Sequence, residues 1–345
     1  MKQWLKNTGM FLACLCLILI TLTGCDAKSA LKQTAGYLVD EAVKDIEEGL
    51  EEYTEQQAEE SAEEEDKDSE DSKDKKDKGK NNKDKDSKKK NNKKPGQLEV
   101  HYIDIGQGDA TLVTCDGAAM LIDAGDNSKG TAVQNYLQKQ GIEKLDYVIG
   151  THPDADHIGG LDVVLYKFDC DTIIMPDIEN DTRTYDDVVQ TMKTKNYKNT
   201  LPKVGDTYSL GSASFTVIAP NHYDYGDNNN NYSVGIILQN GKHRFLFIGD
   251  AEEKAEEDIL ANDIDIRADV YKVAHHGSDT ASIDELQDEV KPQYAVISCG
   301  KDNRYGHPHE EVLQRLTKRD ITTYRTDENG TVVVYSDGKK LTWNQ

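Results

Sequence analysis

The feature that most constrains the fold is a strand, loop and helix pattern at residues 145–160. The apolar run Leu145–Ile149 is typical of a buried strand, and the loop Thr151–Gly160 (Thr-His-Pro-Asp-Ala-Asp-His-Ile-Gly-Gly) follows it directly. A tight loop at a strand end lets alternate side chains point at one centre, and nitrogen and oxygen donors suit zinc or manganese. The loop therefore predicts a metal site made by His152, Asp154, Asp156 and His157.

The spacing of these four side chains allows two metal ions. His152 and Asp154 can hold one ion, while Asp156 and His157, pointing the other way, can hold its neighbour. The alternative is a polar loop whose acids cap a helix starting near Gly160. A cap needs one acid and no histidine, so we favour the metal site.

The loop also resembles a known family. It is similar to the second motif of the metallo-β-lactamase superfamily, His-x-His-x-Asp-His, with Asp154 in place of the middle histidine. Three further stretches resemble the hydrolase domain attached to ComEC competence proteins and its free-standing relatives: Asp104–Ala110 (Asp-Ile-Gly-Gln-Gly-Asp-Ala), Ala274–Ser278 (Ala-His-His-Gly-Ser) and Tyr305–Pro308 (Tyr-Gly-His-Pro). The resemblance covers about residues 97–345 and implies an α/β (α+β) fold, the metallo-β-lactamase-like αββα sandwich.

The first 25 residues are typical of a lipoprotein signal peptide. Lys2 and Lys6 precede the apolar run Met10–Leu22, which is short for a membrane span, and Leu-Thr-Gly-Cys25 resembles a bacterial lipobox. We expect cleavage before Cys25 and lipidation of its thiol, which places the protein outside the cytoplasmic membrane. The alternative is an uncleaved signal anchor.

Two segments separate Cys25 from the folded domain. Residues 26–50 show apolar positions three or four apart from Leu31 to Leu50, which predicts a short helical stalk. Residues 51–95 contain 16 acidic and 13 basic side chains and one aromatic, Tyr53, so they cannot bury a core and are expected to form a disordered linker. The lysines between Lys73 and Lys94 are either solvated or contact an anionic partner such as DNA, teichoic acid or lipid head groups.

Residues 96–345 make up the hydrolase domain, with 42 acidic and 23 basic side chains and a formal charge of −19. This negative charge argues against nonspecific binding to nucleic acid, which normally needs a basic surface. The domain contains Cys115, Cys170 and Cys299, none in a CxxC or CxH spacing, so cysteine-ligated metal is not expected. Two of the three can form a disulfide in an exported protein.

Apolar runs predict a β-meander at residues 98–122, followed by strands that alternate with helices. Strands are expected at 145–149, 172–175, 215–219, 234–239, 244–248, 269–273 and 294–298, with terminal strands around Asn329-Gly330. Helices are expected at 131–140, 185–195, 252–261, 283–290 and 309–318. Asn240-Gly241 predicts a two-residue type I′ hairpin turn.

The resemblance also assigns roles outside the loop. It implies that Asp123, in Ile-Asp-Ala-Gly125, supports the metal loop without ligating, and that Asp250 bridges two metals. Asp250 is alternatively the N-cap of the helix at 252–261, and both roles are compatible. Neighbouring residues at a strand end face opposite sides, so one of His275 and His276 should reach the metal. We assign His275 to the metal and His276 to a substrate oxygen or leaving-group proton, with the reverse assignment open.

Several residues are candidates for substrate contact. The superfamily usually has another histidine ligand before the strand at Val234, where this chain has Asp227–Asn231, a floppy turn on the simplest interpretation. The ion held by His152 and Asp154 then has one ligand fewer. Either it is weakly held, or it is manganese, which oxygen donors favour, or His222 or His307 serves as the missing ligand. Asn231 and Ser278 are further substrate candidates. Arg304 and His307 suit a phosphate, unless Gly-His-Pro308 is only a lead-in to the next helix.

The sequence thus predicts a lipid-anchored extracytoplasmic hydrolase with two divalent ions, zinc or manganese, that generate hydroxide near neutral pH. Asp156, His276 and His307 are the candidate catalytic residues. The resemblance favours a phosphodiester substrate, DNA, and a nuclease role in DNA uptake beside a separate membrane channel. The alternatives are a hydrolase of a smaller ester or cell-wall phosphodiester, and a noncatalytic binding module with a degenerate site.

Overall fold

The computed structural model describes residues 97–345. The predicted signal peptide, stalk and charged linker, residues 1–95, lie outside the described residues, so these assignments and the domain boundary at residue 96 stay predictions. Within the described part of the chain, no helix combines the length and the apolar character needed to cross a bilayer.

The first of two sheets has eight strands in the order β15-β14-β1-β2-β3-β4-β5-β6. Strands β1 to β3 form the predicted antiparallel meander, and β3 to β6 are parallel. The C-terminal β14 pairs with β1, which places the end of the chain against the first strand of the domain. The strands are β1 (Leu98–Tyr102), β2 (Thr111–Cys115), β3 (Ala118–Ile122), β4 (Lys144–Ile149), β5 (Asp169–Ile174), β6 (Asn199–Thr200), β14 (Val332–Ser336) and β15 (Leu341–Trp343).

The second sheet has seven strands in the order β13-β12-β11-β10-β9-β8-β7. Strands β7 to β10 are antiparallel neighbours, and β10 to β13 run parallel. Its strands are β7 (Thr207–Leu210), β8 (Ala213–Ala219), β9 (Gly235–Asn240), β10 (His243–Phe247), β11 (Val270–Lys272), β12 (Tyr294–Ile297) and β13 (Thr322–Arg325).

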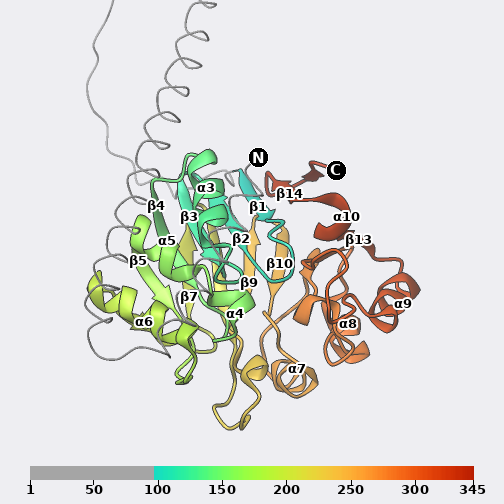
Figure 1. Cartoon of the computed structure of the whole chain (residues 1–345). Helices are drawn as coiled ribbons and strands as arrows, with labels where there is room; N and C mark the ends of the chain where they lie inside the picture. Colours follow the sequence, from blue (N-terminus) through green and yellow to red (C-terminus); the bar gives the residue numbers. More distant parts are fainter. Residues whose placement is uncertain (1–96) are drawn as a thin grey trace, which may run out of the picture. The chain divides into compact units, whose positions relative to one another are not determined.

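Helices cover the outer faces of both sheets, and the two sheets share an apolar core (Figure 1). Helices α3 (Gly130–Lys139), α4 (Ala155–Ile158), α5 (Leu161–Lys167) and α6 (Arg183–Thr194) lie with the first sheet. Helices α7 (Glu253–Leu260), α8 (Asp284–Val290) and α9 (Glu310–Lys318) cover the second, and the remaining short turns are η2 (Asn229–Tyr232), η3 (Ala274–Gly277) and α10 (Thr326–Asn329). The predicted αββα sandwich is therefore confirmed.

Strand β4 shows why the apolar run before the metal loop forms a buried strand. Leu145 and Val148 pack into the core under the helices, whereas Tyr147 and Ile149 belong to the core between the sheets. Because both faces of the strand are covered, nearly every position is apolar instead of every second one.

The β9–β10 hairpin differs from the prediction by one residue. Asn240 pairs with His243 as the last residue of its strand, so the two-residue loop is Gly241-Lys242. Gly241 has φ of 60°, and Lys242 is not among the residues with positive φ, so the type I′ turn is not formed. Gly241 also lies against Gly338, where a Cβ would come within 2.7 Å of the Gly338 Cα, which explains why the turn centres on this glycine.

The three cysteines of the domain are buried and free, so among residues 97–345 no disulfide forms. Burial raises the pKa of the Cys170 thiol to about 12 and that of Cys299 to about 12. Both are inert small apolar side chains at neutral pH.

The carboxyl ends of the parallel strands lie at one edge of the sandwich. Strand β3 ends at Ile122, which pairs with Ile149 at the end of β4. In the second sheet, β10, β11 and β12 end in the segments that carry Asp250, His276 and Ser298. Loops at the carboxyl ends of strands in open sheets are the usual place for ligand sites.

Candidate metal centre

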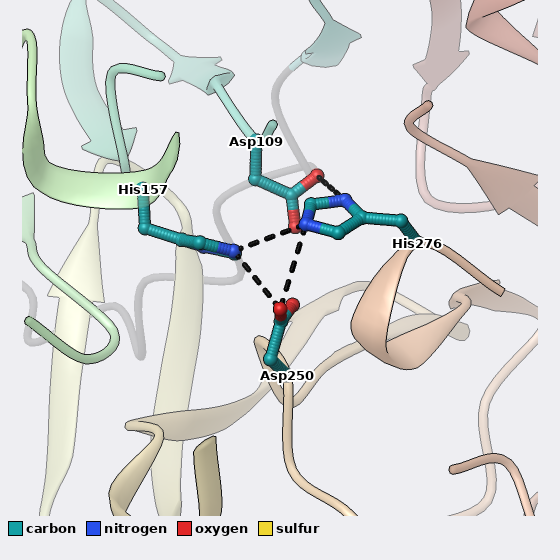
Figure 2. A group of neighbouring side chains, drawn as sticks. All are labelled: Asp109, His157, Asp250 and His276. Carbon is teal, nitrogen blue, oxygen red and sulfur yellow. Dashed lines mark hydrogen bonds and ion pairs between the residues drawn. The ribbon is translucent and has the colours of Figure 1, made fainter. Parts of the chain in front are cut away.

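Four buried side chains from four separate segments meet at this edge. Asp109, His157, Asp250 and His276 each offer one ligand atom, and these atoms all lie within 4.8 Å of one another (Figure 2). Asp109 follows β1, His157 lies in α4 after β4, Asp250 follows β10 and His276 lies in η3 after β11. We call these four residues the cluster.

His157 presents its Nε2 atom to the cluster because its other nitrogen is held from behind. Its Nδ1 lies 2.9 Å from Asp123 Oδ2, and since a carboxylate only accepts, Nδ1 carries the hydrogen. Its Nε2 lies 3.2 Å from Asp250 Oδ2. Burial alone would lower the pKa of His157, but Asp250 and Asp123 together raise it well above the usual range. A carboxylate behind a histidine is the arrangement that orients metal-binding imidazoles.

His276 is oriented in the same way by a backbone carbonyl. Its Nδ1 donates to the Ser298 oxygen at 3.0 Å, which leaves Nε2 facing the cluster. This Nε2 lies 3.2 Å from His157 Nε2, 3.4 Å from Asp250 Oδ2 and 3.3 Å from Asp156 Oδ2. Asp156, a predicted ligand, therefore borders the cluster from the solvent side, with its side chain 31% exposed.

Asp123 lies behind the cluster, where the resemblance implied it would be. Besides His157 it accepts hydrogen bonds from the backbone N and the hydroxyl of Thr151, at 2.8 and 2.7 Å. Its φ is 57°, a left-handed conformation that aspartate tolerates better than most residues. The single carboxylate thus fixes both the start of the metal loop and the ring of His157.

Asp109 is the cluster residue that our sequence interpretation missed. Its carboxylate also pairs with Lys272, whose Nζ lies 2.9 Å from both Oδ1 and Oδ2. The loop before it packs on the metal loop: Asp109 N donates to Asp156 O, and a Cβ at Gly108 would come within 2.4 Å of that same oxygen. The Gly-Asp pair inside the Asp104–Ala110 motif was the available signal.

Asp250 occupies the centre of the arrangement. Its Oδ2 faces His157 and His276, while its buried Oδ1 has no hydrogen-bond partner among the described residues. Burial would raise the pKa of Asp250, but His157 and His276 hold it well below the usual range. The N-cap of α7 is Glu252, so capping does not explain Asp250.

His152 and Asp154 lie next to the cluster and not within it. The His152 ring is completely buried, its Nε2 has no hydrogen-bond partner among residues 97–345, and that atom lies 3.9 Å from Asp154 Oδ2. Asp154 starts α4 without forming a side-chain cap, and its Oδ1 accepts from Asn229. The capping interpretation of the loop acids is therefore wrong for Asp154.

The structure places His276, and not His275, in the cluster. His275 Nε2 lies 3.7 Å from Asp250 Oδ2, and its Nδ1 lies 3.3 Å from Glu252 Oε1, with the ring 20% exposed. Our assignment of the two histidines relied on the alternation of a strand. Both residues instead have left-handed φ, 49° and 53°, within η3, so strand alternation does not apply to them.

The asparagine run is an ordered turn and not a floppy one. Glu252 accepts hydrogen bonds from the side chains of Asn228 and Asn230, and Asn231 Oδ1 accepts from the Glu252 backbone N. The side-chain oxygen of Asn231, a predicted substrate contact, is therefore engaged within this turn. Ser278, also predicted to contact substrate, is buried and bonds the Thr280 hydroxyl at 3.0 Å.

His307 and Arg304 lie at the rim, and His222 lies away from the site. The His307 ring stacks on His276 with centroids 6.2 Å apart. Burial, followed by the charge of His276, lowers the pKa of His307 to about 4, so it is neutral at pH 7. Arg304 is exposed beside Tyr305. His222 faces Asp258 at 3.9 Å, with its side chain 58% exposed.

The donor set of the cluster fits a divalent cation. Two imidazole Nε2 atoms, each fixed from behind, face two buried carboxylates. Asp250 Oδ1 and His152 Nε2 are buried atoms without a hydrogen-bond partner in the described region. Burying carboxylates is costly unless a cation compensates them. Nitrogen and oxygen donors suit zinc and manganese alike.

Comparison with known proteins shows the family of the chain. Residues 103–301 match the family model described as the metallo-beta-lactamase superfamily. ComE operon protein 3 of Bacillus subtilis (strain 168) is 33% identical over 252 residues, which is 68% of this chain and 32% of that protein. Recombination protein 2 of Haemophilus influenzae is 31% identical over 241 residues, 68% of this chain and 28% of that protein. The chain spans about a third of the length of these relatives.

Among solved structures, the metallo-β-lactamase fold protein YhfI of Bacillus subtilis aligns with a TM-score of 0.47 and 12% identity. The alignment covers 70% of this chain and all of that one. The family model spans more than half of the chain, and the layers, the metal loop and the cluster are those of a metal-dependent hydrolase. The chain belongs to the metallo-β-lactamase superfamily.

Proposed function

We propose that this protein is a lipid-anchored, extracytoplasmic phosphodiesterase that cuts DNA. The observation that carries the proposal is the cluster, in which two fixed imidazoles and two carboxylates converge in a buried site. Its relatives include a Recombination protein 2 and a Competence protein ComA, which supports DNA as the substrate class.

Two groups of residues would hold divalent ions. The cluster, with Asp156 at its border, would hold one. His152 and Asp154, which lie beside the cluster, would hold the other together with Asp250. A bound divalent ion supplies an acidified water and positive charge for a developing phosphoryl anion.

The chain's own residues position and shield this chemistry. Asp123 and the Ser298 carbonyl hold the two imidazoles, so their Nε2 atoms stay aimed inward. Asp156 is the carboxylate at the boundary between the cluster and solvent, and we assign it the proton-accepting role. His307 closes the site as a ring stacked on His276, and its neutral imidazole can donate a hydrogen bond to the leaving group.

A second candidate substrate is a smaller ester. The formal charge of −19 over residues 96–345 repels a polyanion, whereas a small or uncharged ester avoids this cost. The choice is open to a direct test on purified protein.

Chelated and remetallated protein should hydrolyse phosphodiesters only with added divalent ion, with manganese at least as effective as zinc. The donors include Asp109, Asp154, Asp156 and Asp250, and oxygen donors favour manganese. Cleavage of DNA should weaken as salt rises, because few cations of this domain face the polyanion and counterions compete with them. The measurement compares duplex DNA, single-stranded DNA and bis(p-nitrophenyl) phosphate over a salt series.

Each other outcome selects a different function. Hydrolysis of an acyl ester or lactone, with no phosphodiester cut by either metal, would replace the nuclease with the smaller-ester hydrolase. If nothing is cut and no metal is retained, the chain is a binding module.

The anchor rests on the lipobox at Cys25. Cys25→Ser should release or misprocess the protein, since lipid attachment needs the thiol. Membrane fractionation and the mass of the mature N-terminus measure this, with Cys16→Ser as the matched control because Cys16 leaves with the signal. Unchanged retention and unchanged mass would refute the anchor.

A further inference from the structure

A pocket of about 490 Å³ opens beside the cluster, on the side of Asp156. Its walls include Gln107, Lys129, Asp156, Arg304 and Tyr305. Asp156 belongs to both places, since its Oδ2 lies 3.3 Å from His276 Nε2. A molecule in this pocket would therefore extend directly to the metal centre.

Arg304 differs from the other arginines of the described domain in what its guanidinium contacts. Within residues 97–345, Arg304 forms no ion pair and bonds only the hydroxyl of Tyr305. Arg315 is bound to two backbone carbonyls. The remaining five pair with carboxylates: Arg183, Arg244, Arg267, Arg319 and Arg325.

Lys129 is the second cation of the pocket and is also without an ion pair in the described part of the chain. The pocket wall also carries two carboxylates. Asp156 faces His276, and Asp126 Oδ1 accepts from the Ser128 backbone N. Two cations that form no ion pair within residues 97–345 therefore lie on the walls of one pocket, in a domain whose charge is −19. Together they make a local attraction for an anion.

A series of stacked side chains connects Arg304 to the cluster. His307 stacks on His276, and Tyr305 stacks on His307 with centroids 5.5 Å apart and planes 20° apart. The Arg304 guanidinium lies 4.8 Å from the centroid of Tyr305. The ring and hydroxyl of Tyr305 together hold the guanidinium in place, which makes Tyr305 a positioning residue.

We propose that this pocket binds a second phosphate of the substrate, next to the phosphate that is cut. The inference rests on the proposed function and narrows it: the substrate is a nucleic acid strand with several phosphates, and a single small diester leaves the pocket empty. Arg304 offers a planar fork of donors and Lys129 a point charge, the two usual ways of binding a phosphate. The attraction is local, so it can act although the domain as a whole is acidic.

The test compares two substrates with the detergent-solubilised full chain, so that every variant carries the same linker. Arg304→Met and Lys129→Met should each lower kcat/KM for a single-stranded oligonucleotide by about 10-fold more than for bis(p-nitrophenyl) phosphate. Arg183→Met and Lys139→Met are matched controls, because Arg183 is exposed elsewhere and Lys139 ends the helix that Lys129 precedes. The controls should leave both activities unchanged.

A second readout does not depend on catalysis. Fluorescence anisotropy with a phosphorothioate oligonucleotide in chelator should show Kd about 10-fold higher for Arg304→Met and Lys129→Met than for wild type. Each variant should also flatten the dependence of log Kd on log salt by about one unit. Tyr305→Leu should raise KM more than it lowers kcat, and Tyr305→Phe, which keeps the ring, should recover part of the loss.

Three outcomes would contradict the proposal that this pocket binds a second phosphate of the substrate. Equal losses on both substrates would mean that the cations act only at the cut phosphate. Unchanged oligonucleotide affinity in both variants would mean that the pocket binds no phosphate. Competition by tripolyphosphate as strong as by an oligonucleotide of equal phosphate content would mean that it takes any polyanion. If wild type cuts neither substrate, the proposed function fails, and the anisotropy alone decides on the pocket.

Discussion

Asp250→Asn should lower kcat/KM by more than about 100-fold and remove bound metal. Replacing residues that only orient metal ligands already costs about 10- to 100-fold, and Asp250 itself faces the Nε2 atoms of His157, His276 and His275 at 3.2, 3.4 and 3.7 Å. Asparagine keeps the shape but loses the charge that compensates a cation. Metal content and kcat/KM measured on the same preparation check this.

The control for Asp250→Asn is Asp263→Asn, because Asp263 is exposed and lies outside the cluster. Metal should raise the melting temperature of wild type and of the control, since a ligand that binds only the folded state stabilises it. The Asp250 variant should show no such rise. A variant that keeps its metal and its activity would mean that Asp250 has a structural role only.

Lys272→Met should lower the free energy of unfolding by about 3–5 kcal/mol, the usual cost of removing one partner of a buried ion pair. Lys272 and Asp109 have side chains only 4% and 7% exposed, and Lys272 Nζ also donates to Val273 O at 3.1 Å. Without the ammonium, the Asp109 carboxylate stays buried with less compensation. Urea unfolding in chelator measures the loss without any contribution from bound metal.

The double variant Lys272→Met with Asp109→Asn distinguishes the effect of an unpaired buried charge on stability from the effect of lost packing. Removing both charges should restore part of the stability, because no buried charge is then left alone. A loss below about 1 kcal/mol in the single variant would show that water reaches Asp109 when the lysine is gone.

The sequence by itself was enough for many of the strands and helices and for the metal loop, and the αββα layers came from the family resemblance that the motifs carry. Strands such as Leu145–Ile149 are predictable because burial on both faces requires a nearly continuous apolar run, and such a run can be recognised within a few residues. The metal loop is predictable for the same reason, since His152, Asp154, Asp156 and His157 lie within six residues and need no distant partner to be recognised.

Tertiary structure alone decided which of these side chains share the cluster. Asp109 and Lys272 are 163 residues apart, and only the packing of one sheet on the other brings them together. His275 and His276 are neighbours with the same chemistry, and left-handed backbone in η3 determines which ring turns inward. The asparagines before β9 favour a turn, and the distant carboxylates of Glu252 and Asp154 hold that turn in place. Local patterns specify elements because propensity and burial act within a few residues, whereas a metal site is a set of distances between segments that only the folded core sets.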